Sequence, residues 1–330
     1  MRIIIVGPGA LGSLLAARIF LFLRERKNSG ADNDDHRLYL LDHRADRAQL
    51  LNEHGLRLKD NGRTVVCRLR VTADPGEIGH CDVLFLCVKA LAVASTLSSI
   101  SPLLAPQTLL IAMQNGIGHL AVLTRSPCNT AAGITSEGAT LLGPGHVRHC
   151  GSGITRLGLL RAGHDAALPL LQETTRLLNG AGLPAEITHH PLHHIWAKLF
   201  VNVGINALSA VHRRTNGQLL TSEPIREQMQ KAVNEAVAVA RAKDIPIVGD
   251  PVSATFKVCR TTRNNVSSML QDVMHQRPTE IDAINGAVVA AGEQLGIATP
   301  VNRELVRQIK AIEAAYDRAD PAKETIHEQN

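Results

Sequence analysis

The pattern of hydrophobic and polar positions changes near residue 190 of this 330-residue chain. Before that point, short β-branched runs alternate with stretches of helical period, which is typical of βαβ units around a parallel sheet. Between the second and third predicted strands, Asn61-Gly62 predicts a type I′ turn and therefore an antiparallel hairpin. The predicted strands cover residues 2–6, 37–42, 82–88, 108–113 and 184–188.

After residue 190 the strand pattern disappears and long helical patterns replace it. Prolines at 224, 251, 278 and 300 lie near the expected helix starts. We therefore expect an α/β protein in which a domain built on a parallel sheet, residues 1–189, precedes an all-helical domain, residues 190–330. A polar, breaker-rich segment at 25–36 predicts a surface loop in the first domain. The predicted helices cover residues 191–211, 223–243, 251–274, 278–295 and 300–317.

Composition narrows the class of protein. Hydrophobic residues make up 45% and charged residues 20%, which is ordinary for a globular protein and excludes a disordered or fibrous one. The longest apolar stretch, 11–23, is interrupted and too short to cross a bilayer, so we expect no membrane span. The N-terminal segment has a glycine pattern and lacks the small-residue cleavage site of a secretory signal peptide. We therefore expect a cytoplasmic protein.

The formal charge of +5 would by itself permit nucleic-acid binding. The basic residues are scattered, however, and only 2% of residues are aromatic, so we expect no nucleic-acid partner. A basic pocket for an anionic cofactor and substrate explains the excess of basic over acidic residues better than nucleic-acid binding does. Six irregularly spaced cysteines without a CxxC pair predict reduced, mostly buried thiols.

The motif Gly7-Pro8-Gly9-Ala10-Leu11-Gly12 follows a predicted strand and opens a predicted helix. This is the context in which GxGxxG binds a dinucleotide. The first glycine permits a tight turn, the second lets the backbone approach the pyrophosphate, and the third allows the helix to pack closely on the strand. Amides at the helix N-terminus, from Ala10 onward, would then face the phosphates. We therefore expect residues 1–189 to form a Rossmann-type dinucleotide-binding domain.

Residues at the end of the second strand bear on the choice of dinucleotide. Asp42 at this position would accept a hydrogen bond from a ribose 2′-hydroxyl and favour NAD. Arg44 or Arg47 could instead bind a 2′-phosphate and favour NADP. A third interpretation treats all of them as ordinary solvent-facing residues, and the motif alone leaves these alternatives open.

In the second domain, Lys198, Asn202 and Asn206 recur every four residues in the apolar segment 195–210. This spacing places all three on one face of a helix. A helix this apolar is expected to be buried with its polar edge lining a cleft, although an ordinary surface helix is the alternative. Burial would lower the pKa of the lysine and make it a candidate general acid.

Other candidates are weaker when taken alone. Glu280, two residues after Pro278, is more typical of a helix-dipole residue than of a catalytic one. Histidines at 189, 190, 193 and 194 suggest a metal cluster, but Pro191 interrupts their helical register and no cysteine or carboxylate lies at ligand spacing. We therefore expect no metal site.

Taken together and in this order, these segments resemble the ketopantoate reductase family from residue 7 to about residue 316. The combination is far more specific than any one motif. The matching segments are GPGALG, CDVLFLCVKA with Lys89, MQNGIG with Asn115, the stripe of Lys198, Asn202 and Asn206, Asn216-Gly217, and NNVSSMLQD followed by TEIDAING.

The resemblance implies NADPH-dependent reduction of a 2-keto acid, most directly 2-dehydropantoate (ketopantoate) to pantoate in pantothenate and coenzyme A biosynthesis, with NADH as the alternative cofactor. It implies that Lys198 is the catalytic acid and Glu280 a catalytic or substrate-binding carboxylate. It also implies that Arg44 reads the NADP 2′-phosphate and that Lys89 lies near the nicotinamide. The substrate contacts that it implies are Asn115, which would also lie near the nicotinamide, Asn202, Asn206, Asn216, Asn265 and Ser268.

Two departures from the family pattern, the 25–36 insertion and Asp42, affect the expected cofactor preference and not the fold. The rival enzymes are a reductase of another branched 2-keto acid and an opine-type dehydrogenase. A non-enzymatic alternative, an NADPH-sensing regulatory protein, is disfavoured by the intact lysine, asparagine and glutamate set. Glu235 receives no role, and the oligomeric state stays open, with a homodimer as one option.

Overall fold

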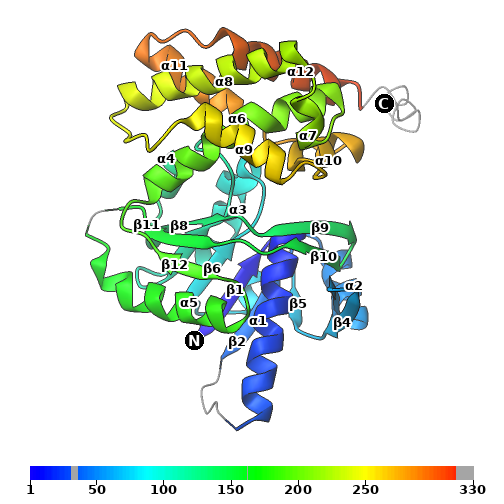
Figure 1. The fold of residues 1–330 in the computed structure, drawn as a ribbon. Coiled ribbons are helices and arrows are strands. Elements are labelled where there is room, and N and C mark those ends of the chain that lie inside the picture. The colour runs from blue at the N-terminus through cyan, green and yellow to red at the C-terminus, as the bar shows by residue number, and fades with distance from the viewer. Residues whose placement is uncertain (31–35, 162, 317–330) are drawn as a thin grey trace, which may run out of the picture. The chain divides into compact units, whose positions relative to one another are not determined.

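The computed structural model describes residues 1–30, 36–161 and 163–316 and divides into two compact units (Figure 1). Unit 1 consists of Met1–Gln114 and His119–Pro191, and unit 2 consists of Asn115–Gly118 and Leu192–Asn330, described as far as residue 316. The division after Pro191 lies next to the predicted domain boundary at 189/190. The segment Asn115–Gly118, which we expected in the first domain, packs with the second unit instead.

Unit 1 is built on an eight-stranded sheet with the order β12-β11-β8-β7-β6-β1-β2-β5. The six strands from β5 to β8 are parallel and follow the strand order of a Rossmann fold. At the other edge β11 runs antiparallel to β8, an addition to the predicted parallel sheet. The strands are β1 (Arg2–Val6), β2 (Arg37–Leu41), β5 (Arg70–Thr72), β6 (Val83–Leu86), β7 (Leu109–Ala112), β8 (Asn129–Thr135), β11 (Thr155–Leu159) and β12 (Ala185–Ile187).

The central strands are apolar on both faces because helices cover both. In β1, Ile3 and Ile5 pack into the core under α1 and α5, whereas Ile4 and Val6 pack into a second core on the opposite face. Figure 1 shows α1 and α5 on the same side of the sheet. The helices of unit 1 are α1 (Ala10–Asn28), α2 (Ala45–His54), α3 (Val93–Ser99), α4 (Leu120–Leu123) and α5 (Leu168–Gly180), with 3₁₀ turns η1 (Pro75–Glu77), η2 (Ala90–Ala92), η3 (Ser101–Leu103) and η4 (Asp165–Ala167).

The predicted loop at 25–36 was wrong in its first part, because α1 continues to Asn28. Arginine, glutamate and lysine at 24–27 are good helix formers, and they extend the helix although they are polar. Ser29 and Gly30 form the turn that ends it, and residues 31–35 lie outside the described part of the chain.

A second sheet of unit 1, with the order β4-β3-β10-β9, contains the predicted hairpin. Asp60 pairs with Arg63 across a two-residue turn in which Asn61 and Gly62 both have positive φ, as a type I′ turn requires. The pattern analysis did not predict β9 and β10, which complete this sheet. Its strands are β3 (Leu56–Asp60), β4 (Arg63–Cys67), β9 (Gly138–Gly143) and β10 (His146–Gly151).

Unit 2 is all-helical within its described residues, as predicted. Helix α6 packs closely against its neighbouring helices α8 and α9 at Gly204. An added Cβ there would lie 2.8 Å from Thr255 of α9 and 2.9 Å from Val233 of α8. The helices are α6 (Pro191–His212), α7 (Asn216–Leu219), α8 (Glu223–Ala242), α9 (Pro251–Thr261), α10 (Ser268–Met274), α11 (Asn285–Leu295) and α12 (Pro300–Ala314).

Two of the predicted helices of unit 2 were wrong in their bounds. The predicted helix 251–274 is interrupted between α9 and α10, where Ser267 caps α10 by accepting a hydrogen bond from the Leu270 amide. The predicted helix 278–295 begins only at Asn285, and Glu280 lies in the preceding turn. Within that turn, the amides of Ala283 and Ile284 both donate to the Glu280 carbonyl at 3.1 Å. Within the described ranges, no helix has the length and apolar character that crossing a membrane requires.

Candidate functional site

The glycine motif of unit 1 forms the turn between β1 and α1. Gly7 has φ +97°, and a Cβ there would lie 3.0 Å from Val88. A Cβ on Gly12 would lie 2.1 Å from the Gly7 carbonyl oxygen, so only glycine lets the helix start this close to the strand. Gly9 differs, because a Cβ there would meet no described protein atom within 4 Å. Gly9 therefore leaves open space where a bound pyrophosphate would approach the backbone.

The start of α1 offers backbone donors to such a ligand. Among the described residues, no side chain caps its N-terminus at Gly9. The first amides of a helix have no partner within the helix, and they carry the positive end of its dipole. Ala10, Leu11 and Gly12 supply these amides, which suits an anionic phosphate.

Asp42, directly after β2, is buried with a fully covered carboxylate. Arg47 pairs with both carboxylate oxygens, with Nη2 at 2.5 Å from Oδ1. The Arg44 amide donates to Oδ1 at 3.2 Å. The interpretation of Asp42 as a solvent-facing residue was therefore wrong. Arg44 itself has a half-exposed side chain paired with Asp46 through Nε at 3.0 Å.

Lys89 lies shortly after β6 and is the N-cap residue of η2. Since β6 pairs in parallel with β1, Lys89 and the glycine turn both follow the carboxyl ends of neighbouring strands. Gln114 holds this edge by donating hydrogen bonds to the carbonyls of Leu86 and Val88 at 2.8 and 3.0 Å.

In unit 2, the predicted polar stripe lies on α6. Residues Val203–Ala210 of this helix are all buried, which excludes an ordinary surface helix. Asn206 is 6% exposed, while Lys198 and Asn202 are half-buried at the edge. Burial lowers the pKa of Lys198 to about 8, and the nearby Glu280 carboxylate offsets part of that shift.

Asn115 joins the same group of residues. Its Nδ2 donates to Oε2 of Glu280 at 3.1 Å, and two residues later the Ile117 amide donates to the Ala283 carbonyl at 3.1 Å. Gly116 makes this close approach feasible, because it has φ +81° and a Cβ there would lie 2.0 Å from the Ala283 oxygen. Asn115, Lys198 and Glu280 thus gather into one cluster of unit 2, although they come from three separate segments.

The turn that carries Glu280 is fixed from α12. Glu313 accepts a hydrogen bond from the Thr279 amide at 2.7 Å, and Lys310 bonds both Glu313, at 3.1 Å, and Asp282, at 2.5 Å. The Thr279 hydroxyl accepts from the Ile281 amide at 3.2 Å. These contacts hold residues 279–282 in a turn where a helix was predicted.

Asn216, Asn265 and Ser268 lie at α7 and the connection between α9 and α10. The Asn216 amide donates to the Asn265 carbonyl at 3.0 Å, and Asn216 Nδ2 donates to the Thr262 hydroxyl at 2.8 Å. Among the described residues, Asn216 Oδ1 is buried without a hydrogen-bond partner. A buried acceptor of this kind suits a hydroxyl or ammonium donor of a ligand. Asn265 and Ser268 are exposed.

Sequence reasoning missed a buried polar network behind α6. Glu235 accepts from the backbone amides of Val301 and Asn302 at 2.8 and 3.0 Å and so caps α12 from α8. Asn302 is fully buried and receives a hydrogen bond from Asn285, which also donates to the Val203 carbonyl on α6. The role left unassigned for Glu235 is therefore structural. No local pattern around Glu235 or Asn285 in the sequence signals this network, because its hydrogen bonds join residues of α6, α8, α11 and α12.

The histidines and cysteines form no further centre in the described ranges. Pro191 begins α6, so His189 and His190 lie before the helix and His193 and His194 lie within it. No group of three or more histidine, cysteine or carboxylate side chains there could hold a metal ion. All six cysteines are free, and only Cys150 is exposed.

Comparison with known proteins covers both units. Residues 3–162 match the family described as "Ketopantoate reductase PanE/ApbA", and residues 192–313 match its C-terminal counterpart. A 2-dehydropantoate 2-reductase of Halobacterium salinarum is 32% identical over 94% of this chain and 98% of its own. One from Vibrio cholerae is 32% identical over 97% of this chain and 100% of its own.

Solved structures agree with this assignment. A PanE/ApbA family ketopantoate reductase from Ralstonia eutropha has a TM-score of 0.84 at 28% identity, covering 96% of this chain and 100% of the other. A D-mandelate dehydrogenase in complex with NADH and anilino(oxo)acetate has a TM-score of 0.85 at 28% identity, covering 96% and 99%. With the glycine turn, the lysine–glutamate cluster and relatives above 30% identity over almost the full length, the chain belongs to the ketopantoate reductase family of nicotinamide-dependent oxidoreductases.

Proposed function

We propose that this protein reduces ketopantoate to pantoate with NADPH. The observation that carries the proposal is the cluster of Lys198, Glu280 and Asn115 on α6 and the turns beside it. The relatives named 2-dehydropantoate 2-reductase support the substrate, since they match the chain over nearly its whole length. When bound, NADPH supplies a hydride to C2 of the substrate, and a proton must reach the carbonyl oxygen.

Lys198 is the proposed source of that proton. An amine with a pKa of about 8 is still mostly protonated at neutral pH, yet it releases its proton more readily than an ordinary lysine. Its positive charge also stabilises the negative charge that develops on the substrate oxygen during hydride transfer. After transfer, the neutral amine recovers its proton from water.

Glu280 and Asn115 are the proposed partners of this lysine. The Glu280 carboxylate favours the protonated form of Lys198 and so keeps the acid charged at working pH. Asn115 donates to Oε2 of the carboxylate, which fixes the orientation of Glu280 in the cluster with Lys198. Asn202 and Asn206 extend the same helix face and are proposed to orient the substrate.

Asn216 is proposed to recognise a hydroxyl group of the substrate. Its Nδ2 already donates a hydrogen bond to the Thr262 hydroxyl. Its buried Oδ1 has no partner among the described residues, so this oxygen is the atom proposed to accept a hydrogen bond from the ligand. Ketopantoate carries a hydroxyl that can donate this bond, whereas pyruvate and 2-ketoisovalerate do not. A site built around an unsatisfied acceptor discriminates strongly against substrates that lack the donor.

The preference for NADPH over NADH rests on the arrangement after β2. The charge of Asp42 is neutralised by Arg47, and both carboxylate oxygens are already hydrogen-bonded, so this acid is poorly placed to bind a ribose 2′-hydroxyl. Arg44 is half-exposed and can exchange Asp46 for a 2′-phosphate. We propose Arg44 as the residue that selects NADPH.

A second candidate function is NADH-dependent turnover of an aromatic 2-hydroxy or 2-keto acid. The likeness to a D-mandelate dehydrogenase bound to NADH favours it. This candidate uses the same lysine chemistry but predicts a different substrate and cofactor preference.

Initial rates distinguish these functions. Ketopantoate, pyruvate, 2-ketoisovalerate and phenylglyoxylate are each compared at equal concentration with NADPH and with NADH. We expect the highest kcat/KM with ketopantoate and NADPH. A preference for 2-ketoisovalerate would contradict the hydroxyl recognition, and a preference for phenylglyoxylate with NADH would favour the second candidate.

A further inference from the structure

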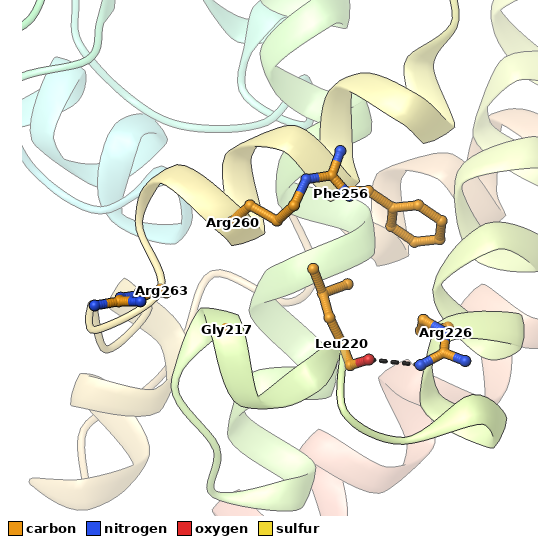
Figure 2. Close-up of a pocket in the computed structure, with 6 residues that line it drawn as sticks. All are labelled: Gly217, Leu220, Arg226, Phe256, Arg260 and Arg263. Atoms are coloured by element: carbon orange, nitrogen blue, oxygen red, sulfur yellow. Dashed lines mark hydrogen bonds between the residues drawn. The ribbon is translucent and has the colours of Figure 1, made fainter.

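Unit 2 contains a pocket of about 530 Å³ whose lining residues include neither Lys198 nor Glu280 (Figure 2). Helices α7, α8 and α9 and the residues next to them form its wall. In Figure 2 the Leu220 side chain is directed toward Phe256 and Arg260, while Arg263 lies at the other edge and is directed away from them. The lining residues are Gly217, Leu220, Arg226, Phe256, Arg260 and Arg263.

Three of these six residues are arginines, and their guanidinium groups differ in what they bind. Arg226 donates to the Leu220 carbonyl at 2.6 Å and pairs with Glu223. Within the described part of the chain, no hydrogen bond or ion pair holds the guanidinium of Arg260 or that of Arg263. Both side chains are exposed, so each guanidinium is accessible to an anionic ligand.

We propose that this pocket binds a small organic anion, with a phosphate or carboxylate head and an apolar body, as an effector of the enzyme. Arg260 would grip the head through two parallel N–H donors, which is the geometry that guanidinium offers to such oxyanions. Phe256 and Leu220 provide an apolar wall for the body, and Arg263 can turn inward to close the edge. A mostly apolar pocket with a few polar anchors is typical of small-molecule sites.

The wall of the pocket is shared with proposed substrate contacts, so the effector role rests on the proposed function. Gly217 donates its amide to the Arg263 carbonyl at 3.0 Å, and an added Cβ on Gly217 would lie 2.6 Å from that of Arg263. The adjoining residue Asn216 bonds Asn265 and Thr262 on the same connection. An anion that orders residues 260–263 would therefore also order Asn216 and Asn265 and preorganise them for substrate.

The test uses the full chain saturated with NADPH, so that the dinucleotide site is filled. Isothermal titration calorimetry is run with phenyl phosphate and with phenylacetate, which separate a phosphate head from a carboxylate head. Benzyl alcohol is the neutral control, and inorganic phosphate is the control without an apolar body. We expect at least one aromatic anion to bind more tightly than inorganic phosphate, and benzyl alcohol not to bind.

Arg260→Gln is the decisive variant. Lys257→Gln is its matched control: Lys257 lies one turn earlier on α9 and is exposed, but it does not line the pocket, and its replacement removes the same charge. We expect Arg260→Gln to weaken binding roughly tenfold, as loss of a charge-assisted hydrogen-bond pair should, and Lys257→Gln to leave it unchanged. Equal losses in both variants would show a diffuse charge effect and overturn the pocket. Thermal midpoints of both variants confirm that they are folded.

Steady-state kinetics tests the effector role. In the wild-type protein, the saturating anion should lower the KM for ketopantoate about fivefold or more, and this effect should vanish in Arg260→Gln. A rise in KM that persists in Arg260→Gln would show competition at the substrate site and would overturn the proposal. If ketopantoate is not a substrate at all, the proposed function fails while the calorimetry still decides whether the pocket binds an anion.

Discussion

Asn115 donates a 3.1 Å hydrogen bond to Glu280, which is 165 residues away in the chain. This contact brings a residue that follows strand β7 into the helical unit, next to the lysine whose pKa is lowered to about 8. It defines the cluster on which the proposed chemistry depends.

Replacing Lys198 by alanine should lower kcat by roughly 10²–10⁴, because it removes a proton donor that acts mainly in the transition state. NADPH affinity should change little, since the glycine turn belongs to unit 1. Turnover, NADPH titration and thermal unfolding are measured on the same preparation. A folded variant with normal NADPH affinity and near wild-type turnover would remove Lys198 from the mechanism.

The pH dependence of kcat should follow the protonation of Lys198. The acid must be charged, so activity should be high below a pKa of about 8 and fall as the pH rises through it. Glu280 raises this pKa, and Glu280→Gln should therefore move the fall in activity to lower pH. A profile unchanged by Glu280→Gln would contradict electrostatic coupling between the two residues.

Gly116→Ala should damage both stability and activity. Its φ of +81° and the 2.0 Å approach to the Ala283 oxygen leave no room for a Cβ. The backbone strain should cost about 1–3 kcal/mol, and displacement of Asn115 from Glu280 should reduce kcat/KM. Gly143→Ala is the matched control, because Gly143 has ordinary φ and a Cβ there would meet no described atom within 4 Å. Thermal unfolding and steady-state rates measure the two effects.

Arg44→Ala should raise the KM for NADPH roughly tenfold, since one charge-assisted hydrogen-bond pair to a 2′-phosphate is lost. The KM for NADH should stay the same, because NADH has no such phosphate. An equal change with both cofactors, or no change with NADPH, would count against Arg44 as the selecting residue.

Glu235→Ala should destabilise unit 2 by about 1–3 kcal/mol. The change removes the acceptor for the Val301 and Asn302 amides and for the buried Asn302 side chain. Glu227→Ala, an exposed change on the same helix, should stay within about 0.5 kcal/mol of wild type. Urea unfolding of both variants gives the comparison, and similar values for the two would argue against the capping role.

Local sequence alone determined the elements whose signals lie within a few residues. Three such elements are the glycine spacing after a buried β1, the two-residue turn at Asn61-Gly62, and the polar stripe of α6, whose three residues recur every four positions. Each follows from backbone geometry at short range. For the same reason, the Rossmann and all-helical classes of the two units could be predicted from periodicity.

Tertiary structure decided the features that depend on distant partners. Residues 279–282 are held in a turn from α12, where Glu313, 34 residues from Thr279, accepts a hydrogen bond from the Thr279 amide. Asn115 belongs to unit 2 because Gly116 lets the backbone reach Ala283, whose carbonyl accepts a hydrogen bond from the Ile117 amide. Each of these outcomes is set by the satisfaction of a buried polar group by a partner far along the chain, and no local pattern encodes which partner that will be.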